Sequence, residues 1–547
     1  MKKKSPSEKK KKNIYESKKK NYGFYIKKLG SFILFCSLLA LMVGMPLYFR
    51  DGYAQIATNK YKFFMATAKY TAFIFGGFLP VFLASWGMNK EERKTYSCLK
   101  KLDIAFLAFI LFVFLSFLFS PYKDNIVGSD YFFYEGAFYG ARGWFMGFMT
   151  FLILVIFYFA ITRFYQYTNV LWWFVIPVAL FIFVWGNCNR YGIYPIEMEY
   201  GNEGYIASMG NINWFSGYVS VLMPLVAGLF IGAKRTWVKI SLIIPLIISF
   251  NTVFLNGSDS LIVTFAVMAG VVFLIGLKSE RVMCGFFGMM SIFWFSCLLI
   301  PVYDAKFTRN YHDALEDIFL KGNLSATMFA ISFVLCLLMA IFVEMGKEFP
   351  KFVKKWLGLI FAVLACILVA AVIAVIAVNT KRGGTLPVIG ENPWFIFNDT
   401  WGSNRGATFK NGWLNFKGMT FFEKLFGAGP DCFYFRLCDN KEAFEYATAK
   451  WGESRLTNAH NEIITLLVNI GILGTGCFIA LNAFAISLFC KWGKKSPCIY
   501  SFALIIVAYL ANNMFSFEQI INTPLYFLML GIGGAAVVKE SEKQGIY

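Results

Sequence analysis

The stretch Thr457-Asn458-Ala459-His460-Asn461-Glu462 leads directly into a long apolar run, Ile463–Leu488. A run of this length and composition predicts a membrane-spanning helix, so His460 lies at the mouth of that helix. Thr457 or Asn458 can cap the helix start, which places the positive end of the helix dipole beside the imidazole. This position favours bound anions and the neutral imidazole, which is the form that accepts a proton. The stretch therefore indicates that His460 is a catalytic general base.

The composition of the whole chain is that of a polytopic membrane protein. It is 58% hydrophobic and only 15% charged, and a soluble domain cannot bury that much apolar surface. The net charge of +20 is concentrated in residues 1–28, where twelve lysines precede Leu29. Such a Lys-rich head is typical of a disordered cytoplasmic tail. Nucleic-acid binding needs a folded basic face, which the sequence does not indicate, so no nucleic-acid partner is expected.

Apolar runs predict up to fourteen membrane spans, near residues 29–49, 70–87, 103–120, 144–162, 168–186, 214–232, 238–255, 259–277, 283–301, 324–344, 357–378, 461–490, 499–516 and 522–538. With the basic head inside, the inner segments hold 32 Lys and Arg, and the outer ones hold 20, ten of them in one long loop. This bias places both termini in the cytoplasm. The predicted fold class is an all-α polytopic membrane protein with about 12–14 transmembrane helices and a long extracytoplasmic loop.

That long outer loop, residues 379–459, has ten basic and eight acidic side chains and is too aromatic for a disordered segment. Its side chains recur at helical spacing in two stripes: Arg405, Phe409, Trp413 and Phe416, then Phe444, Thr448 and Trp451. We expect two amphipathic helices on the outer membrane face. The expected organisation is a tail (1–28), a first bundle (29–378), a lid loop (379–459), C-terminal transmembrane helices (460–538) and a second cytoplasmic tail (539–547).

The twelve cysteines are mostly scattered through apolar runs, where cysteine behaves as a small hydrophobic residue. No Cys-x-x-Cys pair occurs, which argues against metal or redox chemistry. No cofactor is expected.

Several motifs, in order along the chain, resemble the O-antigen ligase and polysaccharide polymerase family. The C-terminal signature is carried by Arg405, Trp413, Gly427-Ala428-Gly429-Pro430, Ala459-His460-Asn461-Glu462 and Gly471-Ile472-Leu473-Gly474. Upstream, Gly210-Asn211-Ile212-Asn213 is similar to the family's Gly-Asn-x-Asn segment at the start of a membrane helix. Ser120-Pro121, Gly136, Arg142 and Gly143 resemble its first outer loop. The motifs extend over most of the chain from about residue 103 to its end.

This resemblance implies a C-type glycosyltransferase-like fold and a metal-independent, inverting enzyme. Relatives transfer a glycan from an undecaprenyl-diphosphate-type lipid to an acceptor hydroxyl on the outer face of the bacterial cytoplasmic membrane. The expected partners are the lipid-linked glycan, a glycan, lipid or protein acceptor, and membrane lipids. Whether the chain is a ligase or a polymerase stays open.

One departure from the family concerns the residues after the seventh span. Relatives commonly carry Ser-Arg-Gly there, and that arginine helps to hold the diphosphate. Here the stretch reads Asn256-Gly257-Ser258-Asp259-Ser260, and an aspartate cannot hold a diphosphate. Either another arginine does so, with Arg142 or Arg190 as candidates, or the donor differs.

The remaining site candidates each have a functional and a structural interpretation. Arg405 offers a planar fork for a diphosphate, although arginine also anchors helices at headgroups. Trp413 is a candidate for sugar stacking. Asn461 and Glu462 are candidates for substrate binding, but polar groups at this position also form structural hydrogen-bond networks.

The alternative class is a membrane transporter or flippase for a glycolipid or small solute. It would explain many spans and intramembrane polar residues without catalysis. The long outer loop that ends at a histidine favours the transferase, because a transferase needs a site shielded from water.

Overall fold

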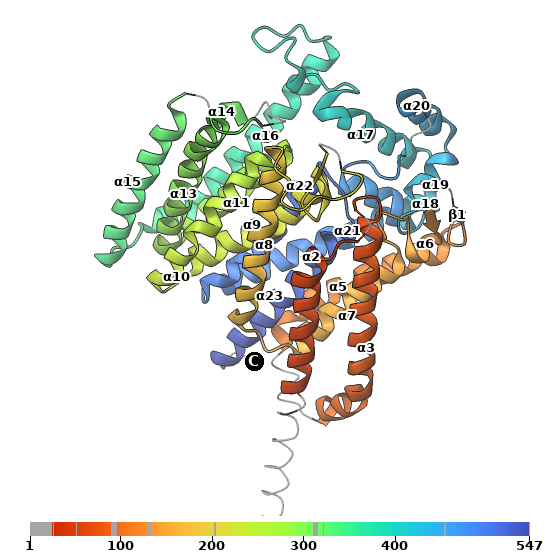
Figure 1. Ribbon diagram of the computed structural model, residues 1–547, viewed down its shortest axis with the longest axis horizontal. Coiled ribbons are helices and arrows are strands. Elements are labelled where there is room, and N and C mark those ends of the chain that lie inside the picture. Colours follow the sequence, from red (N-terminus) through yellow and green to blue (C-terminus); the bar gives the residue numbers. More distant parts are fainter. Residues whose placement is uncertain are drawn as a thin grey trace, which may run out of the picture.

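The computed structural model describes residues 25–545, except residues 26, 51, 89–95, 129–132, 202–203, 310–315, 321 and 453–455. The described residues form an all-α bundle with two short antiparallel β-hairpins (Figure 1). Ten helices in this part of the chain are long and apolar enough to cross a membrane. The predicted class, an all-α polytopic membrane protein, is therefore confirmed. The expected tail 1–28 lies almost entirely outside the described residues.

The first half of the chain contains the span Lys27–Leu47, α3 (Ile56–Met88), α5 (Lys100–Phe119), β1 (Ile126–Gly128), β2 (Phe133–Glu135), α6 (Gly136–Tyr139), α7 (Phe148–Phe164), α8 (Trp172–Arg190), β3 (Tyr205–Ile206), β4 (Gly210–Asn211), α9 (Ile212–Gly232), α10 (Thr236–Ser241), α11 (Ile243–Leu255) and α12 (Asp259–Gly276). The second half contains α13 (Glu280–Asp304), α14 (Glu316–Leu320), α15 (Leu324–Glu344), α16 (Gly358–Lys381), α17 (Trp401–Lys417), α18 (Phe421–Phe426), α19 (Phe433–Cys438), α20 (Lys441–Trp451), α21 (Glu462–Gly493), α22 (Tyr500–Asn513) and α23 (Thr523–Lys543).

All fourteen expected spans overlap a helix. The two apolar helices Phe148–Phe164 and Pro497–Asn513 are shorter than the ten long ones. The expected spans 70–87 and 522–538 correspond to α3 and α23, which are not among the ten. The expected range of 12–14 helices thus includes four that are short or less uniformly apolar.

Helix α9 lies at the centre of the bundle, and its whole apolar stretch is buried. It packs against α22, α11 and α13. Small residues permit this packing, because a Cβ atom at Gly228 would lie 2.5 Å from Cα of Ser501 in α22. Close backbone approach through small residues is the usual way in which membrane helices associate. The consequence for function is that the start of α9, at Asn211, has a fixed position.

Helices α17–α20 lie together at one end of the bundle, beside the start of α21 (Figure 1). We call residues 401–452 the cap. A second apolar core, separate from that of the bundle, joins Tyr122 in the loop after α5, Phe433 in α19 and Val468 in α21. The cap is therefore packed against two other parts of the chain.

The two stripes predicted in the loop do lie on helices, α17 and α20, but each is only partly a packing face: Phe416 is buried and Trp451 packs against the second core. Trp413 and Phe444 remain exposed, whereas Gly412 and Ala443 are buried. A Cβ atom at Gly412 would lie 2.6 Å from Ile464 in α21. Small residues are needed on that side because α17 closely approaches α21. Contact of the aromatic stripes with a membrane stays a prediction.

A break in α21 holds the turn Gly427–Pro430 in place. Gly471 has φ 69° and ψ −178°, which interrupts the helix and leaves backbone carbonyls without their usual partners. The carbonyl oxygens of Val468 and Asn469 accept hydrogen bonds from the N–H groups of Ala428, at 2.8 Å, and Gly429, at 2.9 Å. Two glycine-containing motifs that lie far apart in the sequence thus form one junction.

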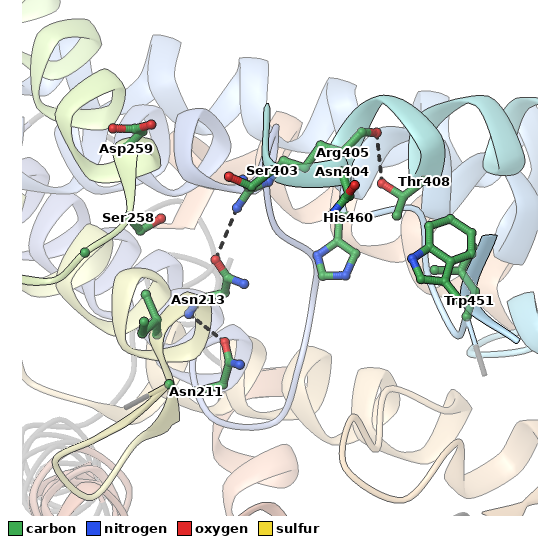
Figure 2. A pocket seen from close by; sticks show the side chains of 14 residues that line it. Asn211, Asn213, Ser258, Asp259, Ser403, Asn404, Arg405, Thr408, Trp451 and His460 are labelled. Atoms are coloured by element: carbon green, nitrogen blue, oxygen red, sulfur yellow. Dashed lines mark hydrogen bonds between the residues drawn. The ribbon is translucent and has the colours of Figure 1, made fainter. Parts of the chain in front are cut away.

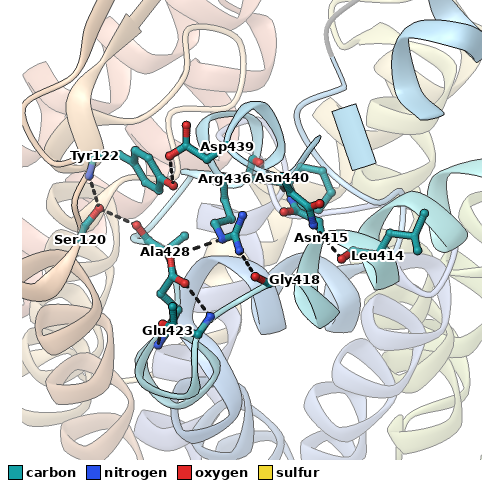
Figure 3. Close-up of polar contacts among 12 residues, drawn as sticks. Ser120, Tyr122, Leu414, Asn415, Gly418, Glu423, Ala428, Arg436, Asp439 and Asn440 are labelled. Carbon is teal, nitrogen blue, oxygen red and sulfur yellow. Dashed lines mark hydrogen bonds and ion pairs between the residues drawn. The ribbon is translucent and has the colours of Figure 1, made fainter. Parts of the chain in front are cut away.

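Polar contacts complete the cap (Figure 3). The buried Arg436 donates to the carbonyl oxygen of Gly418 at 2.5 Å and forms an ion pair with Glu423 at 3.4 Å. Tyr122 donates to Asp439 at 2.6 Å, which ties the cap to the loop after α5. These charged side chains have structural partners, which gives them a role in folding the cap.

Candidate functional site

A cavity of about 530 Å³ lies between the cap and the bundle (Figure 2). Four segments that are distant in the sequence contribute to it: the start of α9, the turn between α11 and α12, the start of α17 and the residues before α21. Its lining consists of Gly204, Asn211, Ile212, Asn213, Gly257, Ser258, Asp259, Ser403, Asn404, Arg405, Thr408, Trp451, Leu456 and His460. Nine of these fourteen residues are polar or charged, in contrast to the apolar core beneath them.

His460 lines this cavity and is the residue directly before the N-cap of α21. Asn461 is the N-cap, because its side chain accepts a hydrogen bond from the N–H of Ile464 at 3.0 Å. The prediction that Thr457 or Asn458 caps this helix was wrong. Asn458 instead accepts from the N–H of His460 at 2.9 Å and holds that residue in the left-handed region, with φ 49°. Backbone strain of this kind is frequent at functional sites.

The surroundings of His460 keep its imidazole neutral. The ring packs edge-to-face against Phe517, with 5.2 Å between the ring centroids. Burial, and secondarily the positive charge of Arg405, lower the pKa of His460 to about 4. At neutral pH the side chain is therefore a proton acceptor. Within the described part of the chain neither ring nitrogen has a hydrogen-bond partner, so both are available to a ligand.

Arg405 lies at the point where α17 becomes a regular helix. The three preceding residues, Gly402 to Asn404, all have φ between 56° and 70°, and they form a left-handed turn that faces the cavity. The guanidinium group donates to the carbonyl oxygens of Phe515, at 2.9 Å, and Gly402, at 3.0 Å, and to Oδ1 of Asn213, at 3.2 Å. These three acceptors are neutral, and together they orient the guanidinium plane.

The opposite wall comes from α9 and α12. Asn211 caps α9 and accepts from the N–H of Asn213 at 2.8 Å. Asn213 in turn accepts from Arg405, so the Gly-Asn-x-Asn segment directly contacts the cap. Asp259, the first residue of α12, lines the same cavity. Figure 2 shows Asp259 and Trp451 at opposite ends, with Arg405 and His460 between them.

The structure brings two of the seven predicted site residues, His460 and Arg405, into the cavity. Arg142 is exposed and donates to Gln55 at 2.9 Å. Arg190 is buried at the end of α8 and is not a lining residue. Neither arginine therefore occupies the place left by the missing family arginine.

The other three candidates also lie outside the cavity lining. Asn461 caps α21 and donates to the carbonyl oxygen of Met514 at 3.0 Å. Glu462 is buried and accepts from Asn513 at 2.5 Å. Trp413 is exposed and is not among the lining residues. Their contacts favour the structural interpretation for Asn461 and Glu462.

Sequence reasoning missed several parts of the site. Ser403, Asn404 and Thr408 line the cavity beside Arg405, and the Gly402–Asn404 sequence was the available signal, since Gly and Asn adopt left-handed conformations readily. No pattern in the local sequence indicated that Phe515 contacts Arg405 or that Phe517 contacts His460. The two phenylalanines come from the loop after α22, more than fifty residues beyond the histidine.

Comparison with models of known protein families gave a match for part of the chain. Residues 317–479 match the model of the O-antigen ligase family. The matched segment includes the cap, Arg405, His460 and the first part of α21. It confirms the family resemblance seen in the sequence motifs. A search of curated proteins found no match.

Proposed function

We propose that this membrane protein, which is similar to the O-antigen ligase family over residues 317–479, transfers a glycan from an undecaprenyl-diphosphate-type lipid to an acceptor hydroxyl. The family match supports glycan transfer in general. The carrier lipid, the chemical mechanism and the residues that perform it are our proposal.

The observation that carries this proposal is the meeting of Arg405 and His460 in one cavity. A fixed guanidinium group suits a diphosphate, which it can bind through two parallel hydrogen bonds. A neutral imidazole suits proton removal from a hydroxyl. A leaving diphosphate and an attacking hydroxyl are the two groups that such a transfer brings together.

The proposed reaction is a single displacement. The neutral imidazole of His460 takes the proton of the acceptor hydroxyl, whose oxygen attacks the anomeric carbon. The bond from that carbon to the diphosphate oxygen breaks, and its electron pair leaves with the lipid diphosphate. Arg405 stabilises the negative charge that develops on the leaving oxygen. One displacement inverts the configuration at the anomeric carbon, and charge stabilisation by Arg405 requires no metal ion.

Binding of the donor would also make His460 a stronger base. In the free protein Arg405 contributes to the low pKa of the imidazole. A diphosphate bound to Arg405 adds negative charge beside the ring, which favours the protonated imidazole. Proton transfer would thus become easier when the donor is in place.

The location of the cavity suits a lipid-linked donor. We place the cap and the cavity outside the bacterial cytoplasmic membrane and both termini inside, following the positive-inside bias of the loops. The cap (within the lid loop 379–459) would then shield the reacting groups from bulk water.

The test compares His460→Ala with the wild type in cells that lack the chromosomal copy. We expect His460→Ala to insert in the membrane at wild-type levels, to lose the surface glycan product and to accumulate the lipid-linked glycan outside. His312→Ala is the matched control, since it removes the other histidine. Normal product from His460→Ala would reject the base assignment, and lipid-linked glycan retained on the inner face would favour the transporter or flippase.

A further inference from the structure

The cavity has two chemically different ends. One is aromatic and is formed by Trp451, with Arg405 and His460 between it and the other end. The other is the turn between α11 and α12, where Ser258 and Asp259 face the start of α9 (Figure 2). A substrate that fills the cavity must meet both ends.

Asp259 lines this end of the cavity and has an unused hydrogen-bond acceptor. Its Oδ1 atom is buried and has no hydrogen-bond partner among the described residues. The neighbouring serines do not supply one, because Ser258 and Ser260 bond to each other at 2.8 Å and Ser260 donates to Asn512 at 3.2 Å. A buried carboxylate oxygen without a donor is costly. A ligand that occupies this end of the cavity and donates a hydrogen bond to the carboxylate would offset that cost.

A diphosphate cannot donate a hydrogen bond to the Asp259 carboxylate. Ionised phosphate oxygens are acceptors, and their negative charge is repelled by a carboxylate in a partly enclosed site. Sugar hydroxyls are donors, and they also match the amide side chains of Asn211 and Asn213 on the same wall. The chemistry of this end therefore fits a sugar.

We infer that Asp259 accepts a hydrogen bond from a sugar hydroxyl, so that the substrate lies with a sugar at the α12 end and its diphosphate at Arg405. This inference deepens the proposed function and rests on it. Asp259 is a specificity-determining residue and takes no part in proton transfer.

The test measures binding of two ligands to the full-length protein in lipid nanodiscs. One is undecaprenyl diphosphate, which has no sugar. The other is the native lipid-linked glycan extracted from cells that carry only the His460→Ala variant. We expect Asp259→Asn to weaken binding of the glycan-bearing lipid about ten- to a hundredfold, the effect of losing a charged hydrogen bond. The same variant binds undecaprenyl diphosphate as tightly as the wild type or more tightly, because a repelling charge is gone.

The hydroxyl can belong to the donor or to the acceptor, and the two sources give different results. A donor sugar gives the loss of donor affinity described above. An acceptor sugar leaves donor affinity unchanged, but Asp259→Asn then raises the acceptor concentration needed for half-maximal transfer. The control is Asp399→Asn, the same chemical change at a residue of the same outer region that lies outside this cavity.

Two results would overturn the inference. In one, Asp259→Asn leaves both donor affinity and acceptor requirement unchanged. In the other, it weakens the two lipids equally, which is the signature of general damage to the start of α12. Failure of the proposed function would give a different result, in which the wild-type protein itself binds neither lipid.

Discussion

At the scale of single residues, the site depends on two side chains whose chemistry is set by their partners. Arg405 is oriented by three neutral acceptors. His460 is kept neutral by burial and by Arg405. Each assignment can be tested by a change that preserves one property of the side chain and removes another.

Arg405→Lys keeps the positive charge but loses the planar fork. If Arg405 binds a diphosphate through two hydrogen bonds, transfer should fall about ten- to a hundredfold, because a charge-assisted bond of about 1.5–3 kcal/mol is lost in the transition state. Transfer from the extracted lipid-linked glycan by purified protein is the measurement. Arg382→Lys, at the end of α16 and outside the cavity, is the control. Equal rates for both variants would leave Arg405 with an anchoring role alone.

The protonation of His460 can be measured directly, because the chain has only two histidines. A folded-state pKa of about 4 lies below the usual value near 6.5, so the ring stays neutral until the pH falls through about 4. Carbon-13-labelled histidine should give one resonance that titrates near pH 4, and His312→Gln identifies it by removing the other. In Arg405→Gln the transition should move upward, since a nearby positive charge is removed. A transition of His460 near 6.5 in the wild type would contradict this account of the site.

At the scale of secondary-structure elements, the break in α21 connects that helix to the cap. Gly471 is left-handed, and a Cβ atom there would lie 2.4 Å from the carbonyl oxygen of Leu425 and 2.5 Å from the N–H nitrogen of Gly427. The junction therefore depends on a glycine at this position, for both conformational and steric reasons.

Gly471→Ala should destabilise the protein by about 1–3 kcal/mol, the usual cost of a side chain in a backbone region that only glycine adopts readily, with an added steric cost. Gly476→Ala is the matched control on the same helix, because a Cβ atom there meets no atom within 4 Å. That change should be neutral or slightly stabilising, since alanine is the better helix former. Thermal unfolding in detergent compares the two. Similar unfolding temperatures would show that the break does not need glycine.

At the scale of the whole molecule, the position of the cap relative to the membrane decides whether the site can meet a lipid-linked donor. We expect residues 379–459 to be outside. Single cysteines at Ser403 and Asn440, introduced into a cysteine-free variant, should react with a membrane-impermeant maleimide added to intact cells. Labelling of both only after the cells are opened would invert the topology and remove the proposed outer-face reaction.

The sequence by itself determined the fold class, because apolar runs of span length are local patterns. A histidine at a helix mouth is also a local pattern, and the sequence indicated both His460 and Arg405, which the structure brings into one cavity. Those patterns indicated α17, α20 and α21 and placed Arg405 and His460 at their starts. Local patterns also misled. In α17, Trp413 of the predicted stripe is exposed while the neighbouring Gly412 is buried, and Asn461 rather than Thr457 or Asn458 caps α21.

Only the tertiary structure decided which residues share the cavity. Arg405 contacts Asn213 across 192 positions of sequence, and it contacts Phe515 across 110. Such contacts depend on how closely helices approach, which is set by small residues such as Gly228 and Gly412 and by the break at Gly471. No sequence period encodes that distance. For this reason Arg142, Arg190 and Trp413, which were plausible from their local sequence, lie outside the cavity lining, while Asp259 faces it.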